Sequence, residues 1–284
     1  MKIKLAKALG TCFGVKNALE QALHEKNKGN LTILGQLVHN PQTVEKLKAY
    51  GIAMINNISE MNKIKTKRVM ITAHGVSEII KKQLIKKGLK VEDATCPLVA
   101  KVHQTIKKMV AKGLFPVVIG HPDHVEVQGI VGDLDEYFVL FDEKDIPKLA
   151  SLDKKKLGIV SQTTNRPEKM EQLVSLIKKQ PGIETVEFSN TVCKPTRDRQ
   201  KAAQQLAQDV DIMIVIGGYN SSNTKKLLKI CEEKNVPGYH IENVSEINLD
   251  WFKEKKRIGI TAGTSTPIEV IDEVYQYLHE CFDK

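Results

Sequence analysis

Three kinds of segment recur along the chain in the same cyclic order, and this recurrence is the strongest constraint on its fold. One kind is a short run that ends in a cysteine and precedes a helical pattern, as at Cys12, Cys96 and Cys193. The other two are apolar, β-branched runs, each followed by a loop of small or polar residues and usually by a helical pattern. Such runs are typical of parallel strands covered by helices on both faces. The sequence therefore predicts an α/β protein made of three similar units.

We expect the three units to span residues 13–94, 95–189 and 190–284, with residues 1–12 completing the third. Each unit is predicted to be a small αβα sandwich. Similar units folded about a common centre would bring one cysteine from each unit to the same point. Cys231 and Cys281 lie inside helical patterns instead, and we interpret them as packing residues.

Three thiolates around one point make a metal or cluster site with an open coordination position. Structural zinc sites and common ferredoxin clusters both use closely spaced cysteines, and this chain has no such pair. Single cysteines, one in each repeat, suit a [4Fe–4S] cluster in which one iron is not bound by protein. That iron could act as a Lewis acid on a substrate oxygen.

The loops after the apolar runs contain imidazole, hydroxyl and amide groups, nearly all of them hydrogen-bond donors. Several of these loops also open a helix, where free N–H groups favour an anion. The pattern indicates a ligand with a phosphate or diphosphate group, although serine, threonine and asparagine at helix starts are also common N-caps. The loops contain no nucleotide-binding motif. Their candidate residues are His39, His74, His124, Thr163, Thr164, Ser221, Ser222, Asn223, Thr264, Ser265 and Thr266.

Glu126 is the one carboxylate singled out in these loops. It is flanked by Val125 and Val127, which could hold it away from water. Burial would raise its pKa and let it donate a proton. The alternative is a surface carboxylate on a first helical turn.

Composition and charge narrow the class of protein. The chain is 41% hydrophobic and 27% charged, as is usual for a soluble globular protein. No apolar run approaches the roughly 20 residues of a membrane span, and the N-terminus lacks a signal-peptide pattern, so we expect no membrane and a cytoplasmic location. The formal net charge of +9 indicates a lysine-rich surface or an acidic partner. Aromatic residues make up only 5%, which argues against nucleic acid.

The motifs together resemble those of the 4-hydroxy-3-methylbut-2-enyl diphosphate reductase family of the non-mevalonate isoprenoid pathway. The resemblance extends over essentially the whole chain, in the stretches DATCPLVAKVH, AHGVS, HVEVQG, SQTTN, NTVCKPTRDRQ, GGYNSSNT and TAGTSTP. It implies an α/β fold of three αβα units in a pseudo-threefold, trefoil-like arrangement around a central [4Fe–4S] cluster. The implied reaction is a reductive dehydroxylation that yields isopentenyl and dimethylallyl diphosphate.

The resemblance also implies a role for each candidate residue. Cys12, Cys96 and Cys193 would be the cluster ligands, leaving one iron open to the substrate hydroxyl. Glu126 would donate a proton through Thr163, with support from His124. The implied substrate-binding residues are His39, His74, His124, Thr163, Thr164, Ser221, Ser222, Asn223 and Ser265.

The family's electron donors are usually ferredoxin or flavodoxin, both acidic, which would suit a basic surface. A different interpretation is a zinc- or cluster-bearing regulatory protein that binds an anionic metabolite. Glu126 favours the enzyme, because a protein that only binds an anion gains nothing from a nearby carboxylate. A cysteine-nucleophile hydrolase would explain one thiol but not three equivalent ones.

Overall fold

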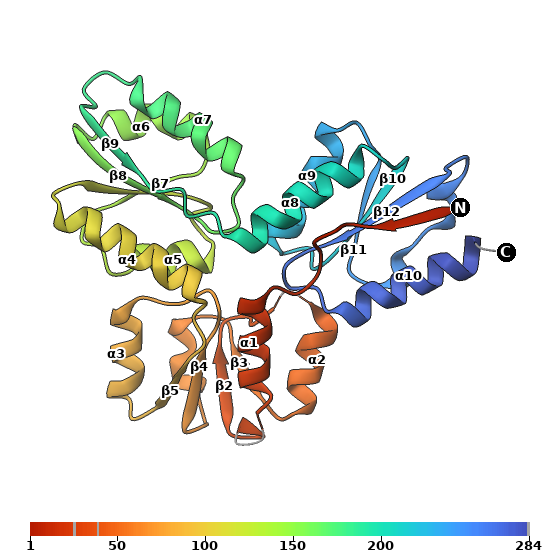
Figure 1. The fold of residues 1–284 in the computed structure, drawn as a ribbon. Helices are drawn as coiled ribbons and strands as arrows, with labels where there is room; N and C mark the ends of the chain where they lie inside the picture. The colour runs from red at the N-terminus through yellow and green to blue at the C-terminus, as the bar shows by residue number, and fades with distance from the viewer. Residues whose placement is uncertain (25–26, 39, 283–284) are drawn as a thin grey trace. The chain divides into compact units, whose positions relative to one another are not determined.

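The computed structural model describes residues 1–24, 27–38 and 40–282. Its strands form three four-stranded sheets, in the orders β3-β2-β4-β5, β7-β6-β8-β9 and β1-β12-β10-β11. All the strand pairs are parallel. Each sheet draws its strands from one of the three predicted segments, which confirms an α/β fold of three units with small parallel sheets (Figure 1).

The strands are short, as the apolar runs indicate. They are β1 (Lys2–Leu5), β2 (Leu31–Leu34), β3 (Ala53–Ile55), β4 (Arg68–Ile71), β5 (Lys90–Asp93), β6 (Phe115–Ile119), β7 (Phe138–Leu140), β8 (Lys156–Ser161), β9 (Thr185–Phe188), β10 (Ile212–Ile216), β11 (Gly238–Ile241) and β12 (Arg257–Ala262).

The α-helices are α1 (Phe13–Ala22), α2 (Pro41–Ala49), α3 (Glu78–Lys86), α4 (Pro97–Ala111), α5 (Val125–Val131), α6 (Ile146–Ala150), α7 (Pro167–Lys178), α8 (Lys194–Ala207), α9 (Ser222–Glu233) and α10 (Ile268–Phe282). Short 3₁₀ turns are η2 (Ile58–Lys63), η3 (Glu143–Asp145), η4 (Val244–Glu246) and η5 (Leu249–Phe252). In the part of the chain that the structure describes, every helix is too short or too polar to span a bilayer.

The sheet around β6 shows how alternation along a strand creates two cores. Val118 and Val117 are neighbours on β6 and point to opposite faces. On the first face, Val118 lies in a core with residues of α4 and α5. On the second, Val117 lies in a core with residues of α6 and α7. The prediction of sheets with helices on both faces is therefore confirmed here.

The sheet around β12 is built in the same way and joins the two ends of the chain. Strand β1 pairs with β12, and Figure 1 shows these two strands, red and blue, side by side. One face packs against α10, and the other packs against α8 and α9. The N-terminal ammonium group also donates to the carbonyl of Phe282 at 3.1 Å.

Spatial proximity groups the chain into two compact units. The first contains residues 1–16, 38–49 and 194–284, and the second contains residues 17–37 and 50–193. The second unit therefore includes the two sheets built from β2–β5 and β6–β9. The expected boundaries at 13–94, 95–189 and 190–284 with 1–12 stay a prediction.

Asp133 ties α3 to α4 within the second unit. Its carboxylate accepts the N–H groups of Glu78 and Ile79 at 3.0 and 3.1 Å, and it accepts Lys107 Nζ at 2.9 Å. Burial alone would raise the pKa of Asp133, but these hydrogen bonds and the Lys107 charge outweigh burial and lower it. The carboxylate thus caps a helix and pairs with a cation at once.

Replacing Asp133 by asparagine is expected to lower the free energy of unfolding by about 1 kcal/mol at neutral pH. A lowered pKa means that this contribution is fully present above the pKa of the unfolded state. It is lost as the pH falls through the folded pKa. Urea unfolding of both proteins between neutral and acid pH should therefore show a difference that shrinks on acidification.

Asp135→Asn is the matched control, because Asp135 is a nearby exposed aspartate. It should unfold like the wild type throughout the pH range. A destabilisation of Asp133→Asn that does not change with pH would contradict the role of its charge.

Candidate functional site

The predicted site residues are distributed over both compact units. The first unit holds Cys12, Ser221, Ser222, Asn223 and Ser265, and the second holds His74, Cys96, His124, Glu126, Thr163, Thr164 and Cys193. His39 lies outside the described residues.

The three cysteines occupy equivalent positions in their sheets. Helices α1, α4 and α8 each begin at the residue after a cysteine, as the sequence predicts. The N–H groups of Cys12, Cys96 and Cys193 donate to the carbonyls of Thr264, Ala73 and Thr163, at 2.9, 3.0 and 2.9 Å. Each acceptor lies two residues beyond the end of the strand that pairs with the cysteine's own strand. Each thiol is thus held at the carboxyl edge of its sheet.

The thiol environment separates these three cysteines from Cys231. Cys12, Cys96 and Cys193 are partly exposed. Cys231 is fully buried in the core beneath α9, and burial raises the pKa of its thiol to about 12. This confirms the packing interpretation for Cys231. Cys281 lies on α10, as predicted, and is partly exposed.

The three partly exposed thiols suit an iron–sulfur group in their chemistry, because thiolate is the usual ligand of such clusters. Within residues 1–24, 27–38 and 40–282, no three His, Cys, Asp or Glu side chains form a group that could hold a single metal ion.

Arg199 fixes the segment before Cys12 and was not singled out from the sequence. It is 8% exposed on α8. Its Nε and Nη2 donate to the carbonyl of Gly10 at 2.9 and 2.6 Å, and Nη2 also lies 3.4 Å from the carbonyl of Leu9. The guanidinium therefore clamps the cysteine loop to a helix of the same unit. Only the motif NTVCKPTRDRQ as a whole marks this position in the sequence.

Glu126 is buried, with 1% of its surface exposed. The N–H of Thr163 donates to Oε1 at 2.6 Å, and the Thr163 hydroxyl donates to Oε2 at 2.7 Å. Val127 is buried whereas Val125 is 45% exposed, so only one of the two flanking valines shields the carboxyl group. The expectation of a carboxyl group held away from water is confirmed, and the surface alternative is wrong.

The Glu126–Thr163 pair can pass a proton in either direction. A hydroxyl both donates and accepts, whereas a carboxyl group donates only when protonated. A protonated Glu126 could donate to the Thr163 oxygen, which would free the hydroxyl proton for another acceptor. The contact therefore has the form of a two-member relay.

His124 and His74 lie beside this pair in the same unit. The N–H of Glu126 donates to His124 Nδ1 at 3.1 Å, so a neutral His124 ring carries its proton on Nε2. The rings of His74 and His124 meet edge to face, with centroids 5.7 Å apart. The structure thus brings together four of the predicted residues, His74, His124, Glu126 and Thr163.

Gln162 holds the neighbouring loop and was also missed in the sequence. Its Oε1 accepts the N–H of His121 at 3.1 Å, and its Nε2 donates to the Thr164 hydroxyl at 3.0 Å. Gly120 allows this approach, since a Cβ there would lie 2.7 Å from Val127 and 3.0 Å from Gln162 Oε1. Gln162 joins the loops after β6 and β8.

The loop after β10 presents the polar residues of the first unit. Asn223 is 1% exposed, and neither Nδ2 nor Oδ1 has a hydrogen-bond partner among the described residues. A buried amide without partners costs about 1–3 kcal/mol, so it points to a ligand that would satisfy it. Ser221 is an N-cap whose hydroxyl accepts the N–H of Thr224 at 3.3 Å. The N-cap alternative therefore applies to Ser221 and does not explain Asn223.

A cation and a glycine complete this loop. Lys226 Nζ donates to the Ser222 hydroxyl at 3.0 Å, which places an ammonium group beside the predicted phosphate donors. Gly217 has φ of 152°, and a Cβ there would lie 2.5 Å from Thr224 Oγ1. Ser265, in the loop after β12, is 8% exposed. The loop after β10 is therefore closely packed at Gly217 and rich in hydrogen-bond donors.

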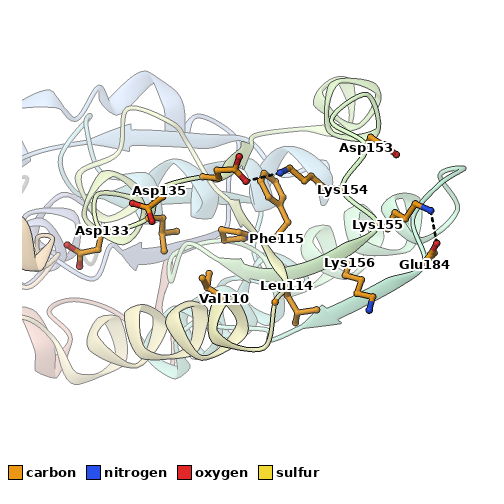
Figure 2. A pocket seen from close by; sticks show the side chains of 14 residues that line it. Val110, Leu114, Phe115, Asp133, Asp135, Asp153, Lys154, Lys155, Lys156 and Glu184 are labelled. Atoms are coloured by element: carbon orange, nitrogen blue, oxygen red, sulfur yellow. Dashed lines mark hydrogen bonds and ion pairs between the residues drawn. The ribbon is translucent and has the colours of Figure 1, made fainter.

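A pocket of about 530 Å³ lies at the opposite, amino-terminal edge of the β6–β9 sheet (Figure 2). Leu114 and Phe115 line it, and so do the residues of two ion pairs, Lys154–Glu136 and Lys155–Glu184. None of the predicted site residues lines it. We therefore assign no part of the candidate site to this pocket.

Curated relatives resemble the chain over its whole length. A protein of Geobacter sulfurreducens is 38% identical over 100% of this chain and 99% of its own length. A protein of Clostridioides difficile is 39% identical, with coverage of 98% and 99%. Both relatives are named 4-hydroxy-3-methylbut-2-enyl diphosphate reductase.

Solved structures agree with these relatives. The E-1-hydroxy-2-methyl-but-2-enyl-4-diphosphate reductase of Plasmodium falciparum superposes with a TM-score of 0.89 at 30% identity, over 98% of this chain and 88% of the other. A structure described as the terminal enzyme of the non-mevalonate pathway gives a TM-score of 0.70 at 37% identity, over 98% and 99%. The LytB protein family model matches residues 3–279. The chain therefore belongs to the LytB protein family.

Proposed function

We propose that this chain is an iron–sulfur-dependent oxidoreductase that converts 4-hydroxy-3-methylbut-2-enyl diphosphate to isopentenyl diphosphate and dimethylallyl diphosphate. Membership of the LytB family and the names of the full-length relatives support this reaction. The observation that supports it best within the structure is the buried contact between Glu126 and the Thr163 hydroxyl. That contact offers a proton donor in a water-poor site.

The reaction consumes two electrons and two protons. The bond between the allylic carbon and the hydroxyl oxygen breaks, and the hydroxyl leaves as water with one added proton. The second proton goes to a carbon of the allyl unit, and the carbon that it reaches decides between the two products. The diphosphate is unchanged, so it can serve as the handle by which the protein binds the substrate.

We propose Cys12, Cys96 and Cys193 as the ligands of one [4Fe–4S] cluster with one open iron. Their equivalent backbone hydrogen bonds and partial exposure support the assignment. When bound, such a cluster supplies electrons and a Lewis-acidic iron for the substrate hydroxyl.

The residues of the second unit would handle the protons. Glu126 would release a proton to the Thr163 oxygen, and the Thr163 hydroxyl would pass its own proton to the departing substrate oxygen. His124 fixes the backbone N–H of Glu126 and presents its own Nε2–H as a further donor. Burial of Glu126 would keep water from competing for the proton.

We propose that polar side chains in the loops at the carboxyl ends of the strands bind the diphosphate. The unpartnered amide of Asn223 supports this role most directly. Ser221, Ser222 and Ser265 add hydroxyl groups, and Lys226 adds a positive charge near Ser222. We assign the remaining diphosphate contacts to His39, His74, His124 and Thr164.

We propose a cytoplasmic enzyme whose electrons come from an acidic protein such as ferredoxin or flavodoxin. The net charge of +9 supports an acidic partner, because opposite charge speeds and orients encounter. A reducing compartment would also keep the cluster thiols available.

Anaerobically purified protein is expected to be brown, with about four irons and four sulfides per chain. Changing Cys12, Cys96 or Cys193 to serine should lower this content sharply, because serine replaces a thiolate ligand. Cys281→Ser, which removes a partly exposed thiol outside the three loops, should leave it unchanged. Metal analysis and visible absorption provide the measurement. Active, colourless protein that contains only zinc would contradict the cluster.

Glu126→Gln is expected to reduce kcat by a factor on the order of 10² or more, because a glutamine amide can accept the Thr163 N–H and donate to the Thr163 hydroxyl but supplies no transferable proton. Iron content and substrate affinity should stay close to those of the wild type. Glu168→Gln, at an exposed glutamate, is the control and should turn over normally. Normal turnover in Glu126→Gln would remove Glu126 from the mechanism.

Asn223→Ala should weaken substrate binding by about tenfold, since it removes amide hydrogen bonds to a charged group. Asn223→Asp should weaken it further, because its negative charge repels the diphosphate at nearly unchanged shape. Calorimetric titration with the substrate compares the two. Equal affinity in Asn223→Asp and the wild type would exclude Asn223 from the diphosphate site.

A further inference from the structure

The loop that presents Ser221 and Asn223 is tied to the end of β11 by a residue with no role in the proposed reaction. Tyr219 lies in this loop and is 47% exposed. Its hydroxyl donates to Glu246 Oε2, and its backbone N–H donates to Glu242 Oε1 at 2.8 Å. One residue therefore attaches the loop twice to the segment that follows β11.

His240 secures the start of the same loop. Its Nε2 lies 2.7 Å from the carbonyl of Gly217, and its ring lies against Tyr219 with centroids 4.7 Å apart. The backbone at Gly217 is in a conformation that side chains rarely adopt, so the loop leaves β10 by a turn that has to be held in place. The ring of Tyr219 and the imidazole of His240 hold it from one side.

Glu246 is itself fixed, which makes it a firm attachment point. It accepts the N–H of Glu242 at 3.2 Å and the Asn243 amide at 2.8 Å. The contact with Glu246 raises the pKa of Tyr219 to about 12, so the phenol stays protonated and remains a donor at neutral pH. All these residues belong to the first compact unit.

We propose that Tyr219, held by Glu242, Glu246 and His240, is a positioning residue that preorganises the 217–223 loop for the diphosphate of the substrate. This inference rests on the proposed function and adds a residue that acts through Ser221 and Asn223 without touching the reacting atoms. We call Tyr219 and its contacts with Glu242, Glu246 and His240 the latch. A loop fixed before binding loses less entropy when the ligand arrives, so the latch acts on the affinity for the diphosphate. Chemistry at the hydroxyl end of the substrate is unaffected by it.

The test compares Tyr219→Phe, Glu246→Gln and the double variant with the wild type. Tyr219→Phe keeps the ring and removes the hydroxyl, so Kd for inorganic diphosphate and KM for the substrate should rise roughly fivefold, as for the net loss of one typical hydrogen bond. The value of kcat should not change. Both single variants alter the Tyr219–Glu246 contact, and Glu246→Gln also alters the contacts of Glu246 with Glu242 and Asn243, so the double variant should bind no more weakly than Glu246→Gln alone.

Amide hydrogen exchange in residues 218–224 gives a readout that needs no ligand. Exchange should be roughly fivefold faster in Tyr219→Phe than in the wild type, the same factor as the expected loss in diphosphate affinity. A purely structural role would instead lower the melting temperature, and the two factors would differ. Tyr137→Phe, at another exposed tyrosine, is the control and should change neither quantity.

The measurements distinguish failure of the latch from failure of the proposed function. Unchanged exchange and unchanged diphosphate affinity in Tyr219→Phe would overturn the latch while leaving the proposed reaction intact. A wild-type chain that binds neither inorganic diphosphate nor the substrate would overturn the proposed function, and with it the purpose of the latch.

Discussion

A single backbone hydrogen bond, repeated three times, fixes the position of each of the three proposed cluster ligands. Each of Cys12, Cys96 and Cys193 donates its N–H to a carbonyl two residues past the end of the adjacent parallel strand. In parallel sheets, the carboxyl ends of the strands share one edge, and loops at that edge collect ligands. The bond therefore stops each cysteine at this edge, and a helix begins at the next residue. The same edge supplies the loops that contain the hydroxyl, imidazole and amide groups.

The carbonyl that holds Cys193 belongs to Thr163, whose N–H and hydroxyl both bind Glu126. One residue thus joins a proposed cluster ligand to the proposed proton donor within the second unit. A substitution at Thr163 would remove the hydroxyl contact with Glu126 but keep the carbonyl that accepts the Cys193 N–H. This shared residue keeps a proposed cluster ligand and the proposed proton donor close together within the second unit.

Much of the fold follows from local sequence patterns. The apolar β-branched runs predict the parallel strands, and the helices after the three cysteines begin where the pattern places them. The buried state of Glu126 was also predictable, although exposed Val125 shows that burial comes from the tertiary fold more than from its neighbours. Arg199, Gln162 and Tyr219 were not predictable, because their partners Gly10, His121 and Glu246 are distant in sequence and follow no periodic pattern. Their contacts exist only after the strands have paired.

The most direct test of the proposed cluster reaction is an EPR titration of anaerobically purified, reduced protein with the allylic diphosphate and, in parallel, with inorganic diphosphate. Both ligands offer the same charged group, and only the allylic diphosphate carries a hydroxyl that can reach an open iron. We expect an iron–sulfur signal that changes with the allylic diphosphate and stays nearly unchanged with inorganic diphosphate. Active protein without an iron–sulfur signal, or a signal that the substrate does not alter, would contradict it.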